Sequence, residues 1–185
     1  EAGKLTAIAV VGLGSDVHVG TFCEDLALAL QREGRTIVID ERAVDAALFP
    51  GAARVPDGDA RSAQVAGWLS QCETAHRFVV YRGEVASAGW TRRCLRQADR
   101  VLALAKASTD PHASSTLLND GLAALYPDDV VEELVLLHEA SVARPRATDA
   151  WLGLRPFSAH HHVKQGDRSS IERAASARNA ARCSP

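Results

Sequence analysis

The stretch IAVVGLGSDVHVGTF, residues 8–22, places a glycine-rich turn between an apolar run and a segment with helical spacing. Residues 6–11 are apolar and β-favouring throughout, which predicts a fully buried strand. Apolar residues then recur every four positions over residues 21–32, and this spacing predicts a helix that stops near Gly34. Together with a second apolar run at residues 36–39, these segments predict a right-handed βαβ unit with parallel strands.

The alternation of strand and helix continues along the chain. Three later apolar runs predict strands at residues 78–81, 101–104 and 134–138. Residues 46–60 are rich in proline and glycine and favour a loop. Helices are expected around residues 65–72, 90–98 and 118–125. The expected fold class is therefore α/β, a three-layer arrangement of an open, mainly parallel sheet with helices on both faces.

The alternation weakens towards the end of the chain. We expect residues 1–143 to form an α/β domain, and residues 144–170 to form a linker with an edge-strand segment at 160–163. Residues 171–185 are expected to begin a last helix. Two full-sized domains are not expected, because 185 residues bury about one ordinary core.

Composition narrows the function classes. The chain carries 21 basic and 23 acidic side chains, a net charge of −2, so no broad positive field favours nucleic acid as a partner. The four cysteines are scattered and form no Cys-x-x-Cys pair, which argues against a zinc or redox motif. No apolar run reaches the roughly 18 to 20 residues of a membrane helix. We therefore expect a soluble domain in a reducing, cytoplasmic compartment.

The glycine turn is the candidate cofactor-binding site. Gly12, Gly14 and Gly20 would let backbone amides approach a phosphate, and Thr21 opens the following helix. However, the dinucleotide fingerprint requires a glycine where Val17 stands, and no lysine closes the loop at Gly20-Thr21 as the P-loop pattern demands. ATP hydrolysis is not expected. Two alternatives stay open, namely weak binding of a nucleotide or phosphate, or a tight structural turn.

Neither metal nor hydrolase chemistry is indicated elsewhere. At most His160 and His162 can share one metal ion, because adjacent strand residues point to opposite faces of a sheet. A polar edge strand is the favoured interpretation, and no metal site is expected. The Gly-x-Ser-x-Gly elbow of serine hydrolases does not occur in the sequence, and no residue is assigned a catalytic role.

A cluster of arginines lies on the helix expected at residues 90–98. Arg92, Arg93 and Arg96 mainly oppose the apolar residues of this helix, so we interpret them as a solvated face. Asp99 is expected to cap the start of the next strand and to form an ion pair with Arg96.

Five segments of the first 105 residues resemble the deviant P-loop class of partition ATPases and the nitrogenase iron protein. They are IAVVGLG, DLALALQREG, TIVIDE, FVVYRG and CLRQADRVLALA. The functional residues of that class are missing, because the loop lysine is absent and Tyr81-Arg82 stands where a metal-associated aspartate is expected. The resemblance implies a degenerate P-loop or Rossmann-like frame without triphosphate chemistry.

A denser resemblance is carried by ETAHRFVVYRGEVASAGWTRRCLRQADRVLALA, residues 73–105, which is similar to a segment of the neuropathy target esterase family. Weaker similarities in the same order extend over most of residues 60–165. In that family of patatin-like lysophospholipases, cyclic-nucleotide-binding-like domains precede this region and the patatin catalytic domain follows it. The resemblance implies that residues 171–185 start the helix leading to a catalytic domain outside this chain.

This resemblance implies a non-catalytic scaffold or regulatory domain of a lysophospholipase, a serine esterase of lipid metabolism. The implied partners are the flanking cyclic-nucleotide-binding-like and patatin domains of the parent protein, with no cofactor and no metal. Membrane contact is expected only indirectly, through the parent protein. The alternative is a nucleotide-responsive switch in which Gly12, Gly14, Gly20 and Thr21 bind the nucleotide.

Overall fold

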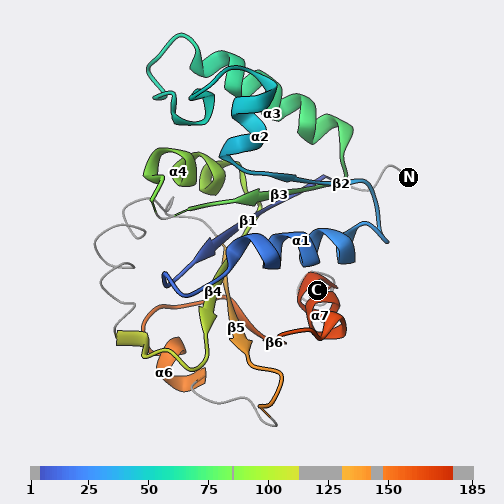
Figure 1. The fold of residues 1–185 in the computed structure, drawn as a ribbon, viewed down its shortest axis with the longest axis vertical. Helices are drawn as coiled ribbons and strands as arrows, with labels where there is room; N and C mark the ends of the chain where they lie inside the picture. Colours follow the sequence, from blue (N-terminus) through green and yellow to red (C-terminus); the bar gives the residue numbers. More distant parts are fainter. Residues whose placement is uncertain (1–4, 85, 113–130, 143–147, 177–185) are drawn as a thin grey trace, which may run out of the picture.

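The strands of this protein form one parallel sheet. The computed structural model describes residues 5–84, 86–112, 131–142 and 148–176. Within these residues the strand order is β2-β3-β1-β4-β5-β6, and every pair of neighbours is parallel (Figure 1). The strands are β1 (Thr6–Gly12), β2 (Thr36–Ile39), β3 (Phe78–Arg82), β4 (Arg100–Lys106), β5 (Glu132–His138) and β6 (Ala159–Lys164).

Helices cover both faces of the sheet, so the expected α/β fold with three layers is confirmed. On one face lie α1 (Val19–Leu30) and α7 (Arg168–Ser176), which pack against each other. On the other face, a second hydrophobic cluster joins the sheet to the remaining helices. They are α2 (Glu41–Ala47), the 3-10 turn Ala52–Arg54, α3 (Ser62–Ala75), α4 (Ala88–Gln97) and α6 (Thr148–Leu152). Figure 1 shows that α2 and α3 extend beyond the β2 edge of the sheet.

The central strand β1 is buried on both of its faces. Ala7, Ala9 and Val11 contribute to the cluster beneath α3 and α4, whereas Ile8 and Val10 contribute to the cluster beneath α1 and α7. The expected buried strand is therefore confirmed. Because β3 and β4 lie on opposite sides of β1, the strand order divides at β1, and the turn that follows β1 emerges where ligands of open α/β sheets bind.

Helix α2 was not expected from the sequence. Asp40 begins it as an N-cap, since its Oδ1 atom accepts a hydrogen bond from the Ala43 amide at 2.9 Å. Asp45 then folds the following segment back, by accepting hydrogen bonds from the amides of Gly51 and Ala53 at 3.0 and 2.9 Å. The expected loop at 46–60 thus contains the end of a helix and a 3-10 turn. The helix expected at 118–125 lies outside the described residues.

The expected edge strand is confirmed as β6, which pairs with β5. The spacing of Ser169 and Glu172 predicts a capping box for α7, but this prediction is wrong. Asp167 accepts the hydrogen bond from the Ser169 amide at 3.0 Å instead. Glu172 reaches across to α1 and pairs with Arg32 at 2.6 Å, because α7 lies directly against that helix.

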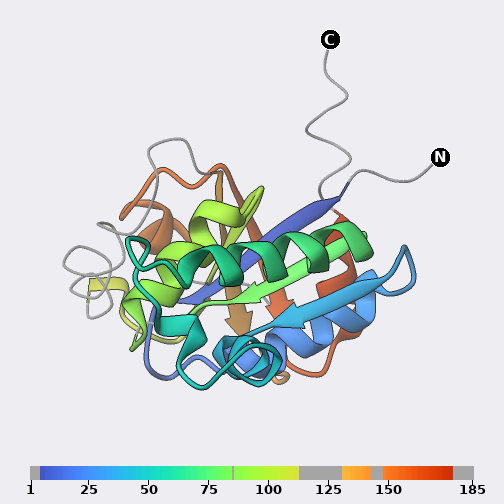
Figure 2. The same ribbon diagram turned by 90° about the horizontal axis from the view of Figure 1, so that it is seen from above.

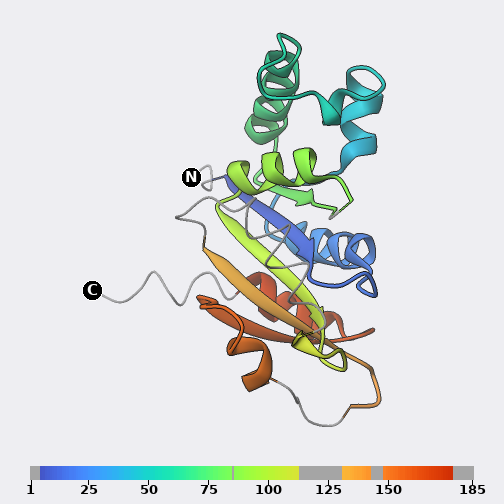
Figure 3. The ribbon, with the colours of Figure 1, turned by 90° about the vertical axis from the view of Figure 1, so that its left-hand side faces the viewer.

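Both described ends of the chain reach the amino-terminal edge of the sheet. β1 starts there, and the amide of Thr6 donates a 2.9 Å hydrogen bond to the Arg77 carbonyl, just before β3. Helix α7 follows β6 and runs back beside α1, where Glu172 meets Arg32 just after the end of α1. Figures 2 and 3 show that β1 begins on the side towards which α7 runs.

One arginine of α4 is buried, which corrects the interpretation of a fully solvated face. Arg93 is 6% exposed, and its Nη2 atom donates to the Val55 carbonyl at 3.0 Å and to Asp57 at 3.1 Å. Arg96 pairs with the same Asp57 rather than with Asp99. Asp99 Oδ2 accepts a 2.9 Å hydrogen bond from the Ala7 amide of β1, the neighbour of the strand that it was expected to cap.

A buried ionic cluster lies at the amino-terminal ends of β4, β5 and β6. Arg100 Nε donates to Glu133 at 2.6 Å, and His161 Nε2 lies 2.7 Å from the same carboxylate. Burial opposes the ionisation of Glu133, but the hydrogen bonds from His161 and Arg100 outweigh it and lower the Glu133 pKa to about 2.

The Glu133 cluster predicts a loss of stability in acid. Because the pKa is lower in the folded state than its ordinary 4.5, the carboxylate stabilises the fold above pH 4.5, and this contribution is lost as the pH falls towards 2. We expect Glu133→Gln to lower the free energy of unfolding at pH 7 by about 3 kcal/mol, since the buried Arg100 is left unpaired. Urea unfolding at several pH values measures both effects.

The control for this prediction is Glu172→Gln, which removes the exposed pair with Arg32 and should cost about 1 kcal/mol or less. An acid-induced loss between pH 4.5 and 2 that is equally steep in Glu133→Gln and in the natural chain would contradict the prediction.

A second prediction concerns α4. Arg93→Ala should lower the free energy of unfolding by about 2 kcal/mol, because the Val55 carbonyl and the neighbouring loop lose their buried donor. Arg92→Ala removes an exposed side chain from the same helix and should change the free energy by about 0.5 kcal/mol or less. Denaturant midpoints of the two variants make the comparison, and equal effects would refute the structural role of Arg93.

Candidate functional site: the charged carboxyl-terminal edge

The glycine turn after β1 is closed by packing. Gly12 ends β1 against α1, and a side-chain Cβ placed there would lie 3.0 Å from the Val19 Cγ2 atom. The next residue, Leu13, is fully buried, and its amide donates to the Leu104 carbonyl of β4 at 2.8 Å. Val17 is also buried, so two apolar side chains anchor the turn in the core.

Hydrogen bonds within the turn use several of its amides. The amide of Val17 donates to the Gly14 carbonyl at 3.4 Å, and that of Val19 donates to the Val17 carbonyl at 3.1 Å. Asp16 ties the turn to the residues after β4, by accepting a 2.8 Å hydrogen bond from Thr109. The turn is therefore held in shape by the protein's own groups.

The first turn of α1 carries the remaining candidate residues, Gly20 and Thr21. His18 precedes this helix and makes no side-chain capping bond, so its side chain does not satisfy the amides of Gly20 and Thr21. A Cβ at Gly20 would lie 2.9 Å from Nη1 of Arg82 and 3.0 Å from its Cζ atom. The guanidinium of Arg82 thus lies directly against Gly20.

Arg82 ends β3, and two carboxylates hold it. Its Nη2 atom lies 2.9 Å from Glu84 Oε1, and its Nη1 atom lies 3.8 Å from Oδ2 of Asp40. The Arg82 side chain is 33% exposed, so the pairs are partly shielded from water. The charge of Arg82 is therefore balanced by groups of the protein itself.

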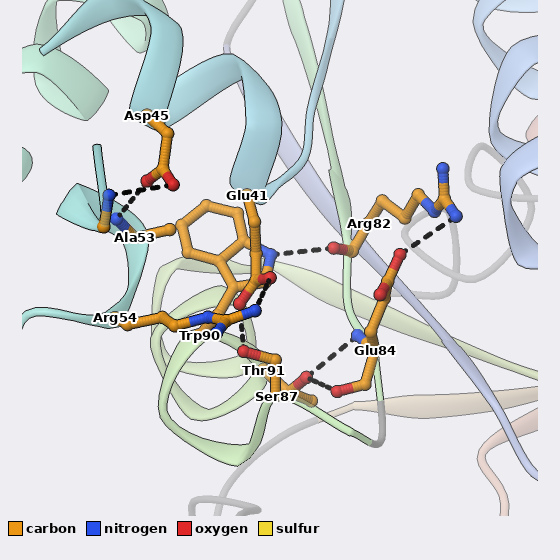
Figure 4. A network of polar contacts seen from close by, with 10 residues as sticks. Glu41, Asp45, Ala53, Arg54, Arg82, Glu84, Ser87, Trp90 and Thr91 are labelled. Atoms are coloured by element: carbon orange, nitrogen blue, oxygen red, sulfur yellow. Dashed lines mark hydrogen bonds and ion pairs between the residues drawn. The ribbon is translucent and has the colours of Figure 1, made fainter. Parts of the chain in front are cut away.

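These residues line a charged cleft of about 370 Å³ at the carboxyl-terminal ends of β2 and β3. Figure 4 shows the polar network around it, in which Glu41 bonds Ser87 and Arg54. Thr91, which is fully buried, donates to the Glu84 carbonyl at 2.6 Å. The lining residues are Asp40, Glu41, Arg42, Asp45, Arg54, Arg82 and Glu84.

The cysteines near the sheet are not reactive nucleophiles. Burial raises the pKa of Cys23 in α1 to about 12, although Arg82 partly counteracts this effect. Burial also raises the pKa of Cys72 and of Cys94, so these thiols stay protonated at neutral pH. Cys23, Cys72 and Cys94 are buried and unbridged, as expected, and Cys183 lies outside the described residues.

Histidines of β5 and β6 meet on the other side of the sheet's centre. His138 Nε2 lies 2.9 Å from His162 Nδ1, and the rings of His160 and His162 lie edge to face with 5.5 Å between their centroids. Burial lowers the pKa of His138 and His162, which favours neutral rings. Within the described ranges, no three side chains of the metal-ligating kinds are placed to hold an ion.

The structure brings Gly12, Gly20 and Thr21 together at the head of α1, with Gly14 in the turn before them. Binding of a nucleotide by these residues stays a prediction. Sequence reasoning noted Arg82 only as a departure from an expected aspartate and missed its contact with Gly20. One signal in the sequence could have indicated the cleft. In both TIVIDE and FVVYRG, a charged residue stands at or directly after the end of a strand, and these two strands are neighbours in the sheet.

Comparisons with solved structures show a P-loop-like fold. The ParA family ATPase from Chlorobium tepidum has a TM-score of 0.57 at 11% identity, covering 98% of this chain and 94% of that chain. Cobyrinic acid a,c-diamide synthase from Mycobacterium smegmatis, solved with bound ADP and magnesium, has a TM-score of 0.60 at 12% identity, covering 98% of both chains. At these identities the likeness concerns the fold alone.

Sequence comparisons show the family. Patatin-like phospholipase domain-containing protein 6 of Pongo abelii is 33% identical over 167 residues, which make up 88% of this chain and 12% of the relative. Lysophospholipase NTE1 of Cryptococcus neoformans is 32% identical over 165 residues, or 87% of this chain and 10% of the relative. The chain thus spans only about a tenth of these relatives.

The described residues contain no helix that is both long and apolar enough to cross a membrane. The model of the Neuropathy Target Esterase family P-loop like domain matches residues 4–183. The chain belongs to the neuropathy target esterase family, as its P-loop-like domain.

Proposed function

We propose that this domain is a non-catalytic scaffold of a patatin-type lysophospholipase and that it keeps its shape without a nucleotide. The observation that carries the proposal is the position of Arg82 against Gly20, at the head of the helix that follows the glycine turn. Asp40 and Glu84 already neutralise this arginine, and the loop has no lysine. A phosphate at the head of α1 would have to compete with these two carboxylates for the Arg82 guanidinium.

The ends of the domain support a connecting role. Since β1 starts and α7 finishes towards the same edge of the sheet, segments before and after the domain would meet at that edge (Figure 3). The domain would then hold the flanking cyclic-nucleotide-binding-like and patatin domains close together, on the cytoplasmic side of a membrane that its neighbours contact. The parent protein would hydrolyse the acyl ester of a lysophospholipid with a serine supplied elsewhere.

The scaffold proposal predicts that this chain has no esterase activity of its own and that the parent protein needs the domain for full lysophospholipase activity. The purified chain should turn over neither a lysophospholipid nor a p-nitrophenyl ester. In the parent protein, exchange of residues 5–176 for a flexible Gly/Ser linker should reduce lysophospholipase activity several-fold, because the flanking domains lose their fixed arrangement. Activity is measured per mole of purified protein with the same substrate.

A parent protein carrying Gly67→Ala is the matched control, since a Cβ at this position in α3 meets no atom within 4 Å. It should be as active as the natural parent. Ester turnover by the isolated chain that one serine substitution abolishes, or a linker variant as active as the intact parent, would refute the scaffold.

The second candidate is the nucleotide-responsive switch. The uncapped first turn of α1, with Gly20 and Thr21 beside the Arg82 guanidinium, favours it, because helix N-termini and arginines both attract phosphates. The two candidates differ in one measurable property, namely whether ligand binding stabilises the chain.

Thermal melting of the purified chain with millimolar ATP, GTP or a cyclic nucleotide separates the candidates. A ligand at about 100 times its dissociation constant adds about 2.7 kcal/mol of stability. We expect no rise in the melting temperature, since Arg82 is already paired. A rise in the melting temperature that Arg82→Gln abolishes would support the switch and refute a scaffold that works without a nucleotide.

A further inference from the structure

We propose that Arg82 is an internal latch that holds the first turn of α1 to the start of α2 and to the turn before α4. These elements meet at the carboxyl-terminal edge of the sheet, and the latch does not depend on whether the domain serves as a scaffold. It rests on three contacts of one guanidinium, with Gly20, Asp40 and Glu84.

The contact with Gly20 is steric. A Cβ at Gly20 would lie 2.9 Å from Nη1, 3.0 Å from Cζ and 3.4 Å from Nη2 of Arg82. All three distances are short, so the guanidinium packs broadly on the glycine rather than touching it with one atom. The Arg82 guanidinium therefore occupies the space that a side chain at position 20 would need.

The two carboxylates extend the latch to other elements. Asp40 uses Oδ1 to cap α2 at the Ala43 amide, and its Oδ2 lies 3.8 Å from Arg82 Nη1, so the same side chain begins a helix and lies within ion-pair distance of the guanidinium. Glu84 is held by Thr91 of α4, whose hydroxyl oxygen lies 3.0 Å from the Glu84 amide and 2.6 Å from its carbonyl. Arg82 thereby connects three segments that are distant in the sequence.

The backbone of Arg82 is fixed as well. Its carbonyl accepts a 2.8 Å hydrogen bond from Trp90 Nε1 (Figure 4). The amide of the next residue, Gly83, donates to the Val10 carbonyl at 2.9 Å. The Nε atom of Arg82 is buried and has no hydrogen-bond partner within the described part of the chain. Only the terminal nitrogens hold the latch, so neutralising Glu84 should weaken it.

The steric contact makes the latch testable by substitution at Gly20. Gly→Ala changes inside helices ordinarily stabilise, because alanine has the higher helix propensity. In the natural chain, Gly20→Ala should instead lower the melting temperature, since the new methyl group displaces the guanidinium from its carboxylates. In an Arg82→Ala background the methyl group meets no guanidinium, and Gly20→Ala should raise the melting temperature.

Gly67→Ala in α3 is the matched control, because no atom lies within 4 Å of its Cβ position. It should raise the melting temperature equally in the natural chain and in the Arg82→Ala background. A reversal of sign at Gly20 alone identifies a direct coupling between positions 20 and 82, which an ordinary surface ion pair would not produce. A Gly20→Ala effect that is the same in both backgrounds would overturn the latch.

Amide hydrogen exchange gives a second readout that does not require removal of Arg82. Glu84→Gln preserves the size of the side chain and removes the charge that lies 2.9 Å from Nη2. We expect the amides of Val19, Phe22 and Gly83, which donate to backbone carbonyls, to exchange several-fold faster in this variant, with those of α7 unchanged. Unchanged exchange in the first turn of α1 would contradict the latch even if the alanine variant of Arg82 fails to fold.

Discussion

The burial of β1 between β3 and β4 constrains the rest of the molecule. A strand with apolar side chains on both faces has to occupy the middle of the sheet, and helices then have to cover both sides. The chain leaves β1 where the strand order divides, so the glycine turn and the head of α1 lie beside the ends of β3 and β4. Register places Arg82 next to Val10, two residues before β1 ends at Gly12.

A cation at the head of a helix is unfavourable by itself, because the N-terminal end of a helix carries partial positive charge. Arg82 is stable there because Asp40 and Glu84 approach it from two other elements. Both carboxylates also line the cleft, together with Glu41, Asp45, Arg42 and Arg54, so the charge of the cleft is mixed. Beside the glycine turn, the guanidinium of Arg82 therefore lies between carboxylates of the protein itself.

Periodicity was sufficient to predict the sheet, because β1, β4 and β5 are apolar runs that fit a buried strand. It missed α2, since seven residues with only Val44 buried give too short a pattern to detect. It also misjudged Arg93, whose partner Asp57 lies 36 residues away in a loop. The contact between Arg82 and Gly20 is likewise non-local, because it depends on β3 pairing beside β1. Local spacing identified the glycine turn but not what fills the space beside it.

The most direct measurement is a high-resolution crystal structure of this chain grown with excess Mg-ATP. The account predicts the Arg82 guanidinium packed on Gly20 and paired with Glu84, with no nucleotide at residues 12–21. An Arg82 side chain turned away from Gly20, with a nucleoside phosphate seated on the backbone of the glycine turn, would contradict it.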